Sequence, residues 1–112
     1  MKNLLITFFF ISLSAFSQDF PSGMVAVEFN ASFNKSNEVG WLPKLSDCET
    51  KRVDITADSR WSKEYKIVVV PTIVIFNNNE EVKRFQANIM MTMEATKSEV
   101  QNSIDEIVME AF

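Results

Sequence analysis

The chain has 112 residues, of which 46% are hydrophobic and 23% are charged, and its formal net charge at pH 7 is −4. This length suits one domain with a single core. The acidic balance argues against nucleic acid as a partner, because phosphate contacts need clustered Lys and Arg. The sequence has no histidine, which excludes imidazole metal ligands, His general bases and Ser-His or Cys-His catalytic pairs.

The first 17 residues have the pattern of a secretory signal peptide. Lys2 supplies a basic start, an apolar stretch runs from Leu4 to Leu13, and Ala15-Phe16-Ser17 is a small-x-small cleavage site. We expect cleavage before Gln18, which leaves one domain at residues 18–112. We therefore predict an exported protein, periplasmic or secreted.

The alternative for this segment is an uncleaved membrane anchor. Thr7, Ser12 and Ser14 interrupt the apolar stretch, which is shorter than the roughly 20 residues that a spanning helix needs. We expect no stable membrane span after cleavage, although retention of the segment stays open. Residues 18–112 carry ten basic and fifteen acidic residues, a formal charge of −5.

The first half of the domain predicts a strand, a helix and a second strand. Met24 to Phe29 is a run of β-formers typical of a strand buried on both faces. Residues 34–42 have a more helical pattern, and Pro43 ends it because proline cannot continue a helix. In Glu49 to Thr56, apolar and charged residues alternate as in a half-buried strand.

The second half predicts a short helix, a hairpin and a final helix. Asp58 caps the short helix. Ile73 to Phe76 is the strongest strand signal, and Asn77-Asn78-Asn79 forms a turn into a returning strand at Glu81 to Phe85. Thr96 and Glu99 form a capping box for the last helix. Its apolar face contains Val100, Ile104, Ile107, Val108 and Ala111.

The resulting order is β-α-β-α-β-β-α, an α/β architecture with a central mixed sheet flanked by helices. The segments Val25 to Phe33 and Tyr65 to Phe76 resemble those around the active site of thioredoxins. The resemblance covers nearly all of residues 18–112 and implies a minimal thioredoxin fold without the extra N-terminal strand and helix of full-length thioredoxins. Residues 38–51 are several residues shorter than the thioredoxin pattern, so we expect a truncated second helix.

Where thioredoxins carry the redox-active Cys-x-x-Cys, this chain reads Asn34-Lys35-Ser36-Asn37. An amide cannot attack a disulfide, and thiol exchange requires a thiolate nucleophile. The resemblance therefore implies a protein that is redox-inactive, has no catalytic residue at the motif and is not a thioredoxin-type enzyme. Asn is also a good partner for the free N–H groups of a first helical turn.

The resemblance also identifies a peptide-accepting face. Val70-Pro71-Thr72 matches the family's cis-proline loop, which implies a cis bond between Val70 and Pro71; the alternative is a trans proline that starts an edge strand. Gln86-Ala87 occupies the place of a Gly-Ala step that borders the substrate groove, and Met90 follows it. We expect the face to consist of Asn34, Ser36, Val70, Pro71, Thr72, Gln86, Ala87 and Met90.

Glu28 matches a buried acid of the family and Arg52 matches a neighbouring Lys. Burying a lone carboxylate is costly unless it is paired. We therefore expect Glu28 to contact Arg52 across neighbouring strands in a structural role. The alternative is a solvent-facing Glu28 at a strand end.

Two further features suggest alternative functions. Cys48, the single cysteine, lies between Asp47 and Glu49, whose negative charges raise a thiol pKa and lower its reactivity. A free cysteine is most often a small buried hydrophobe, but an exported chain can use it for a disulfide with another protein. Met90, Met91 and Met93 can bind Cu(I) through their sulfur atoms, although such methionines more often fill a core.

The leading hypothesis is an exported thioredoxin-like domain that binds a protein or an extended peptide without redox chemistry. It needs no cofactor and no metal. The alternatives are a thiol-disulfide role through Cys48 and copper binding through methionines. Partner, pathway and oligomeric state stay open at this level.

Overall fold

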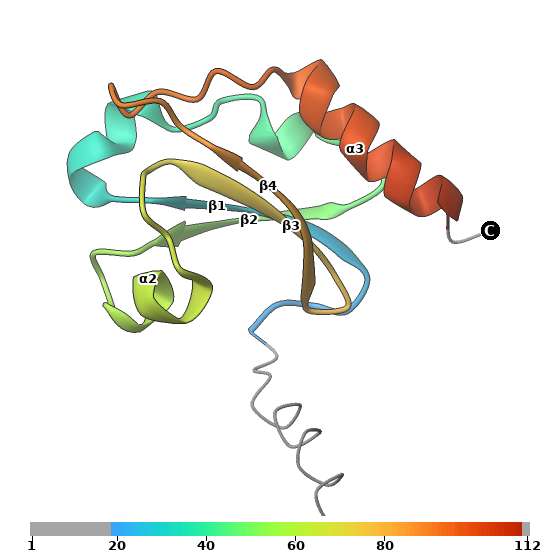
Figure 1. The fold of residues 1–112 in the computed structure, drawn as a ribbon, viewed down its shortest axis with the longest axis horizontal. Helices are drawn as coiled ribbons and strands as arrows, with labels where there is room; N and C mark the ends of the chain where they lie inside the picture. Colours follow the sequence, from blue (N-terminus) through green and yellow to red (C-terminus); the bar gives the residue numbers. More distant parts are fainter. Residues whose placement is uncertain (1–18, 111–112) are drawn as a thin grey trace, which may run out of the picture.

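The computed structural model describes residues 19–110 (Figure 1). The expected signal segment and Ala111, the last apolar position predicted for the C-terminal helix, lie outside this range. Within residues 19–110, no helix combines the length and apolar character needed to cross a membrane.

A four-stranded mixed sheet forms the centre of the domain, in the order β2-β1-β3-β4. Strand β1 (Met24–Asn30) pairs in parallel with β2 (Glu49–Asp54) and antiparallel with β3 (Thr72–Asn77), which pairs antiparallel with β4 (Glu80–Gln86). The two central strands each have five consecutive buried residues, because both of their faces are covered. The turn into β4 uses Asn78 and Asn79 at positive φ, a conformation that asparagine tolerates.

The predicted helix at residues 34–42 is wrong: this segment forms two short 3-10 helices, η1 (Ser32–Asn37) and η2 (Leu42–Lys44). Asn34 departs from helical geometry inside η1, with φ −114° and ψ 20°. Gly40 follows with low helix propensity, and Pro43, placed in the first turn of η2, starts that turn instead of ending a longer one. The shortened connection between β1 and β2 therefore contains two short 3-10 helices and no continuous α-helix.

Two α-helices complete the fold, α2 (Arg60–Tyr65) and α3 (Lys97–Glu110), and they lie on opposite sides of the sheet (Figure 1). The Asp58 carboxylate accepts a hydrogen bond from the Arg60 N–H at 2.9 Å, just ahead of the first turn of α2. The capping box of α3 forms in both directions, between the Thr96 N–H and Glu99 at 2.9 Å and between the Glu99 N–H and Thr96 at 3.2 Å.

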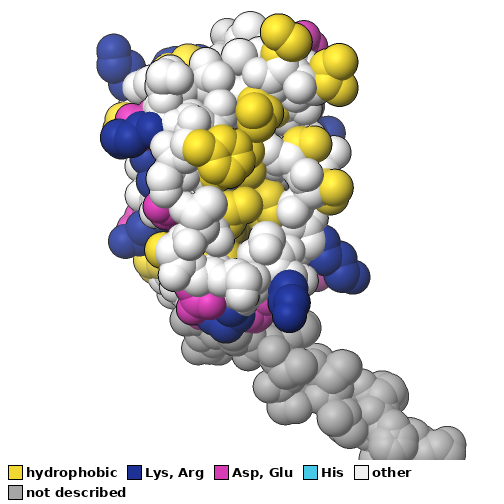
Figure 2. Space-filling view, turned by 90° about the vertical axis from the view of Figure 1, so that its left-hand side faces the viewer, with side chains coloured by type: hydrophobic (Ala, Val, Ile, Leu, Met, Phe, Trp, Pro, Cys, Tyr) yellow, Lys and Arg dark blue, Asp and Glu magenta, His cyan; other side chains and the backbone are white. Residues whose placement is uncertain are grey.

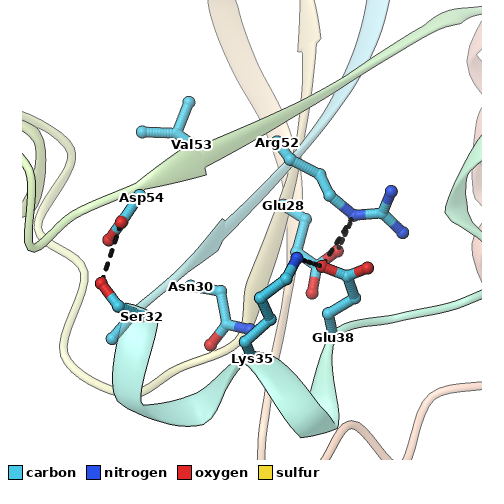
Figure 3. Close-up of a pocket in the computed structure, with 9 residues that line it drawn as sticks. Glu28, Asn30, Ser32, Lys35, Glu38, Arg52, Val53 and Asp54 are labelled. Atoms are coloured by element: carbon cyan, nitrogen blue, oxygen red, sulfur yellow. Dashed lines mark hydrogen bonds and ion pairs between the residues drawn. The ribbon is translucent and has the colours of Figure 1, made fainter.

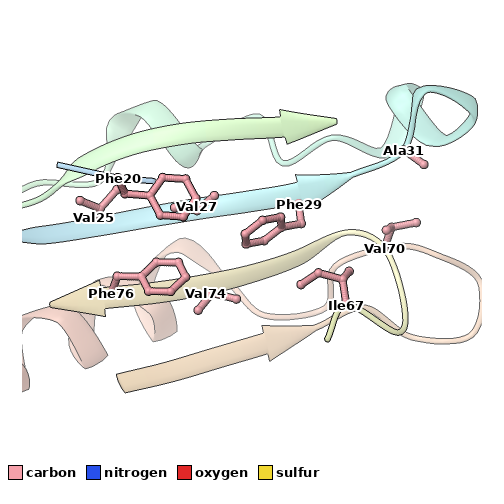
Figure 4. Close-up of a cluster of buried hydrophobic side chains, with 9 residues drawn as sticks. All are labelled: Phe20, Val25, Val27, Phe29, Ala31, Ile67, Val70, Val74 and Phe76. Carbon is pink, nitrogen blue, oxygen red and sulfur yellow. The ribbon is translucent and has the colours of Figure 1, made fainter. Parts of the chain in front are cut away.

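The sheet separates two hydrophobic cores, because successive residues of a strand point to opposite faces. The core on the α2 side is shown in Figure 4 and includes Phe29 and Phe76, both essentially inaccessible to solvent. The core on the α3 side includes Ile73 and Ile104. Helix α3 buries Val100 and Ile104 against its face of the sheet, and α2 packs the partly buried Trp61 and Tyr65 against the other.

Residues 19–23, which we call the N-terminal strap, close the core on the α2 side. Phe20 is 7% exposed and its ring stacks on Phe76 at 5.1 Å between centroids. The Asn79 amide holds the strap on both sides: its oxygen accepts from the Phe20 N–H at 3.1 Å and its nitrogen donates to the Phe20 carbonyl at 2.8 Å. The Asn78 oxygen likewise accepts from the Gly23 N–H at 2.8 Å.

Candidate functional site

The side chain of Asn34 lies buried at the point where three segments meet, with 3% of its surface exposed. Its amide nitrogen donates to the Asn30 side-chain oxygen and to the Met91 carbonyl, both at 3.1 Å, and the Val70 carbonyl lies 3.5 Å away. Its amide oxygen accepts from Asn37 at 2.8 Å. Asn34 therefore links the end of β1, the loop before β3 and the loop after β4.

The other residues of the motif contribute no thiol. Lys35 and Ser36 are exposed on η1, and the Lys35 ammonium forms an ion pair with Glu38 at 3.2 Å. Phe33, the residue before Asn34, is 73% exposed. The exposed groups here are therefore the paired Lys35 cation, the Ser36 hydroxyl and the Phe33 ring, whereas the Asn34 and Asn37 amides bond to one another.

In the loop before β3, the peptide bond between Val70 and Pro71 is cis. The side chains of Val70, Pro71 and Thr72 are all buried, and Val70 belongs to the core on the α2 side. These three residues were expected at the peptide-accepting face, and this expectation is corrected for their side chains, which are buried and do not face a partner. Thr72 is 0% exposed, and its backbone belongs to β3. The Pro71 carbonyl accepts from the Ala87 N–H at 3.1 Å, which joins this loop to the end of β4.

Residues 87–94, which we call the methionine loop, are organised around the side chain of Asn88. Its oxygen accepts from the N–H groups of Met90 at 2.9 Å and Thr92 at 3.1 Å, and its nitrogen donates to Glu94 at 2.8 Å. The Met91 N–H donates to the Asn88 carbonyl at 2.9 Å. Asn88 is not among the site residues predicted from the sequence, although an Asn at the start of a loop is a known signal for such a turn.

Exposed apolar side chains gather at this end of the molecule (Figure 2). They come from η1, from the loop before β3 and from the methionine loop, and Ile89 is the most exposed at 95%. Of the residues expected at the face, Gln86 and Met90 are exposed and Ala87 is half-buried. We define the apolar face as Phe33, Val68, Ile89, Met90 and Met91.

Of this set, the sequence analysis identified only Met90 as a face residue. Val68 and Ile89 lie within apolar runs and Phe33 stands between Ser32 and Asn34, and the sequence does not show whether such a side chain points to the core or to solvent. The exposed position of Ile89 depends on the conformation of the methionine loop. The face is therefore a property of the tertiary structure.

Glu28 is fully buried and paired with Arg52 (Figure 3). The Arg52 Nε lies 3.1 Å from Glu28 Oε1, and the Val39 N–H donates to Glu28 Oε2 at 2.9 Å. Burial raises the pKa of the Glu28 carboxyl, and the hydrogen bonds from Val39 and Arg52 oppose that rise. Arg52 also donates to the Val39 carbonyl, so the pair ties β1 to β2 and to the segment between η1 and η2.

A cavity of about 190 Å³ lies beside this pair, between η1 and the ends of β1 and β2 (Figure 3). Its polar lining is engaged in internal contacts: the Ser32 hydroxyl donates to Asp54 at 3.0 Å. Hydrogen bonds from Thr56, and further ones from Ser32, lower the pKa of the Asp54 carboxyl. Among residues 19–110 no group of three or more His, Cys, Asp or Glu side chains is arranged to hold a metal ion.

Cys48 lies far from the Asn34 motif. It precedes β2, and because β1 and β2 run parallel, the start of β2 is at the opposite end of the sheet from η1. The half-buried thiol packs against the core on the α3 side. Burial, and then the Asp47 charge, raise the pKa of the Cys48 thiol, which lowers its thiolate fraction.

Comparison with known proteins gives matches in structure only. No protein-family model and no curated protein matches the sequence. A mutant thioredoxin from Halobacterium salinarum matches with a TM-score of 0.60 and 19% identity, over 86% of this chain and 82% of that one. Reduced Schistosoma mansoni thioredoxin pre-protein matches with 0.60 and 20% identity, over 85% and 89%.

A third structure, thioredoxin-2 described as a component of malaria parasite protein secretion machinery, matches with a TM-score of 0.61 and 15% identity, over 79% of this chain and 86% of that one. Similarities at this level show the fold. The chain therefore has a thioredoxin-like fold with a single cysteine, and the predicted α/β fold class is confirmed.

Proposed function

We propose that this protein is a redox-inactive binding module, which holds an extended segment of another protein against its apolar face. The observation that carries the proposal is the set of exposed apolar side chains on η1 and on the two loops that Asn34 contacts, the loop before β3 and the methionine loop. Contiguous apolar patches on soluble proteins commonly mark interaction sites. The face needs a partner to remove it from water.

The loss of thiol chemistry supports binding without catalysis. The side chain at the motif that is most buried, Asn34, is an amide whose hydrogen bonds go to its own protein. The one thiol lies at the opposite end of the sheet with a raised pKa. Capture of a partner at the apolar face is therefore non-covalent and does not require a cysteine in the partner.

The backbone near the face supports an extended partner. No hydrogen bond among the described residues involves the Val70 N–H, which belongs to the loop beside Asn34. An extended segment can pair with such a group and place alternate side chains on the apolar surface, as in strand addition. The side chains of the face are uncharged, and this favours an apolar segment over a charged one.

The proposed place of action is outside the cytoplasm, in the periplasm or as a secreted protein. This part rests on the signal-like pattern of the first 17 residues. The acidic balance of the chain disfavours nucleic acid as a partner. Neither a metal nor a cofactor is part of the proposal.

The proposal is tested with a short, dye-labelled, cysteine-free peptide that alternates valine and threonine around a central phenylalanine. We expect fluorescence anisotropy to report binding, and Phe33→Ser or Ile89→Ser to weaken it by about tenfold or more, because each removes a large apolar contact. Both side chains are exposed, so we expect stability to change by no more than about 0.5 kcal/mol. Val70 is unsuitable for this test because its side chain is in the core.

Met109→Ser is the matched control, since Met109 is 73% exposed and lies in the last turn of α3, a helix whose C-terminal end is far from η1 in Figure 1. It should bind the peptide like the wild type. Cys48→Ser should also bind normally. Equal loss of binding in the Phe33 and Met109 variants would contradict the proposed face, and loss in Cys48→Ser would favour the thiol alternative.

A further inference from the structure

We infer that Met90 and Met91 form an oxidation switch, in which conversion of their thioethers to sulfoxides makes the apolar face polar and releases the bound segment. The inference rests on the proposed function, because it assigns regulation to the same face. It makes the methionine loop a modification site as well as a contact surface.

The methionines of the described chain differ in their access to solvent. Met90 is 71% and Met91 37% exposed. Met24 and Met93 are half-buried and pack against the core on the α3 side, where an oxidant reaches them less readily. Met109, on α3, is as exposed as Met90 but lies away from the face. Two of the five side chains of the apolar face are therefore accessible thioethers.

The backbone of the loop holds these two side chains outward. The Met90 N–H is bonded to the Asn88 side chain, and the Met91 N–H to the Asn88 carbonyl. The Met91 carbonyl accepts from the Asn34 amide. Met91 also has φ 61°, a left-handed conformation that is unfavourable for a residue with a side chain. These contacts keep the loop from turning its methionines into the core.

The oxidant is a peroxide, which is a two-electron acceptor. The thioether sulfur attacks one peroxide oxygen, the O–O bond breaks and an S–O bond forms, so that sulfur loses two electrons. With hydrogen peroxide the second oxygen leaves as hydroxide, takes the proton that the attacked oxygen still carries, and departs as water, which leaves the neutral sulfoxide. The product sulfoxide is polar and is returned to the thioether by methionine sulfoxide reductases.

The polar product opposes docking because its oxygen must lose hydrogen-bonded water when a segment covers the face, and an apolar partner offers no replacement. The only thiol does not compete effectively for the oxidant. Cys48 is half-buried at the other end of the sheet, and its raised pKa keeps it protonated. The change in binding is thus specific to the methionine loop.

The experiment measures the dissociation constant of the valine-threonine peptide before and after hydrogen peroxide treatment, and locates the added oxygen by peptide mass mapping. We expect oxidation at Met90 or Met91 to weaken binding by about tenfold, which corresponds to about 1.4 kcal/mol. Sulfoxide reductase treatment should restore the original constant. Each variant is compared with itself, so that any change in its untreated affinity cancels.

The Met90→Leu/Met91→Leu double variant should show no change in its dissociation constant on peroxide treatment. Peroxide treatment of the Met109→Leu variant should weaken peptide binding as much as it does in the wild type. An unchanged constant in wild-type protein that carries sulfoxide at Met90 or Met91 overturns the switch and leaves the proposed function intact. The switch is also overturned, with the proposed function left intact, if mass mapping finds that peroxide oxidises Met109 but neither Met90 nor Met91. If the untreated protein does not bind the peptide, the proposed function fails and the switch fails with it.

Discussion

At the scale of single residues, Asn34 shows how one buried amide can hold several segments together. Here an amide nitrogen faces the Asn30 side-chain oxygen and the Met91 carbonyl. The side chain cannot react with a disulfide, but it joins segments that are distant in sequence.

We predict that Asn34→Asp destabilises the fold at neutral pH by about 2 kcal/mol, because a carboxylate replaces the donor and faces two acceptors in a buried place. Urea denaturation measures the change. Ser36→Asp is the matched control, since it adds the same charge at an exposed position of η1 and should change stability by no more than about 0.5 kcal/mol. Equal midpoints for the two variants would show that the Asn34 hydrogen bonds contribute little.

At the scale of elements, the N-terminal strap closes the core on the α2 side, a role that is not predicted from the sequence. The strap inserts Phe20 between Phe76, Trp61 and Tyr65, with ring centroids 5.1 to 6.0 Å apart. One buried ring and two hydrogen bonds between the Phe20 backbone and the Asn79 side chain thus close the core on the α2 side.

We predict that Phe20→Ala costs about 3 kcal/mol or more, because it removes a buried aromatic ring and leaves a cavity. Thermal or urea unfolding measures the loss. Phe33→Ala makes the same chemical change at a side chain that is 73% exposed, so it should be nearly neutral for stability. A neutral Phe20→Ala would mean that the strap adds little to the core.

At the scale of the whole molecule, two cores share one sheet, and Glu28 lies in the central strand as a buried charge. Its contacts with Arg52 and the Val39 N–H connect β1 to β2 and to the segment between η1 and η2. Burial still dominates and raises the pKa of Glu28. The pair therefore adds connection between elements at a cost in desolvation.

This raised pKa predicts a pH dependence of stability. The folded state holds the Glu28 proton more tightly than the unfolded chain does, so the free energy of unfolding loses a contribution as pH rises from about 4.3, the pKa of a free glutamate, towards the raised value. Below this window the contribution is fully present.

Glu28→Gln cannot ionise and lacks this contribution. The free energy of unfolding of the wild type minus that of the variant should therefore fall as pH rises through the window, as measured by urea titrations at several pH values. A difference that grows with pH would mean that Arg52 and Val39 outweigh burial and that the pKa is lowered.

Local patterns in the sequence were sufficient for most of the fold. The buried runs of β1 and β3, the asparagine turn and the capping box of α3 are determined by neighbouring residues, because strand alternation, turn chemistry and capping act over a few positions. The segment containing Asn34 and Gly40 was predicted wrongly as one helix, since the geometry of its return to β2 decides its conformation.

The site divides in the same way. The amino-acid sequence by itself determined that no Cys-x-x-Cys, no histidine and only one thiol exist, so it limited the chemistry. Only the tertiary structure decided that Val70 is buried while Phe33 and Ile89 are exposed, and that Asn34 contacts Met91. These facts depend on contacts between residues far apart in the chain, and the burial of an apolar side chain is set by what packs against it.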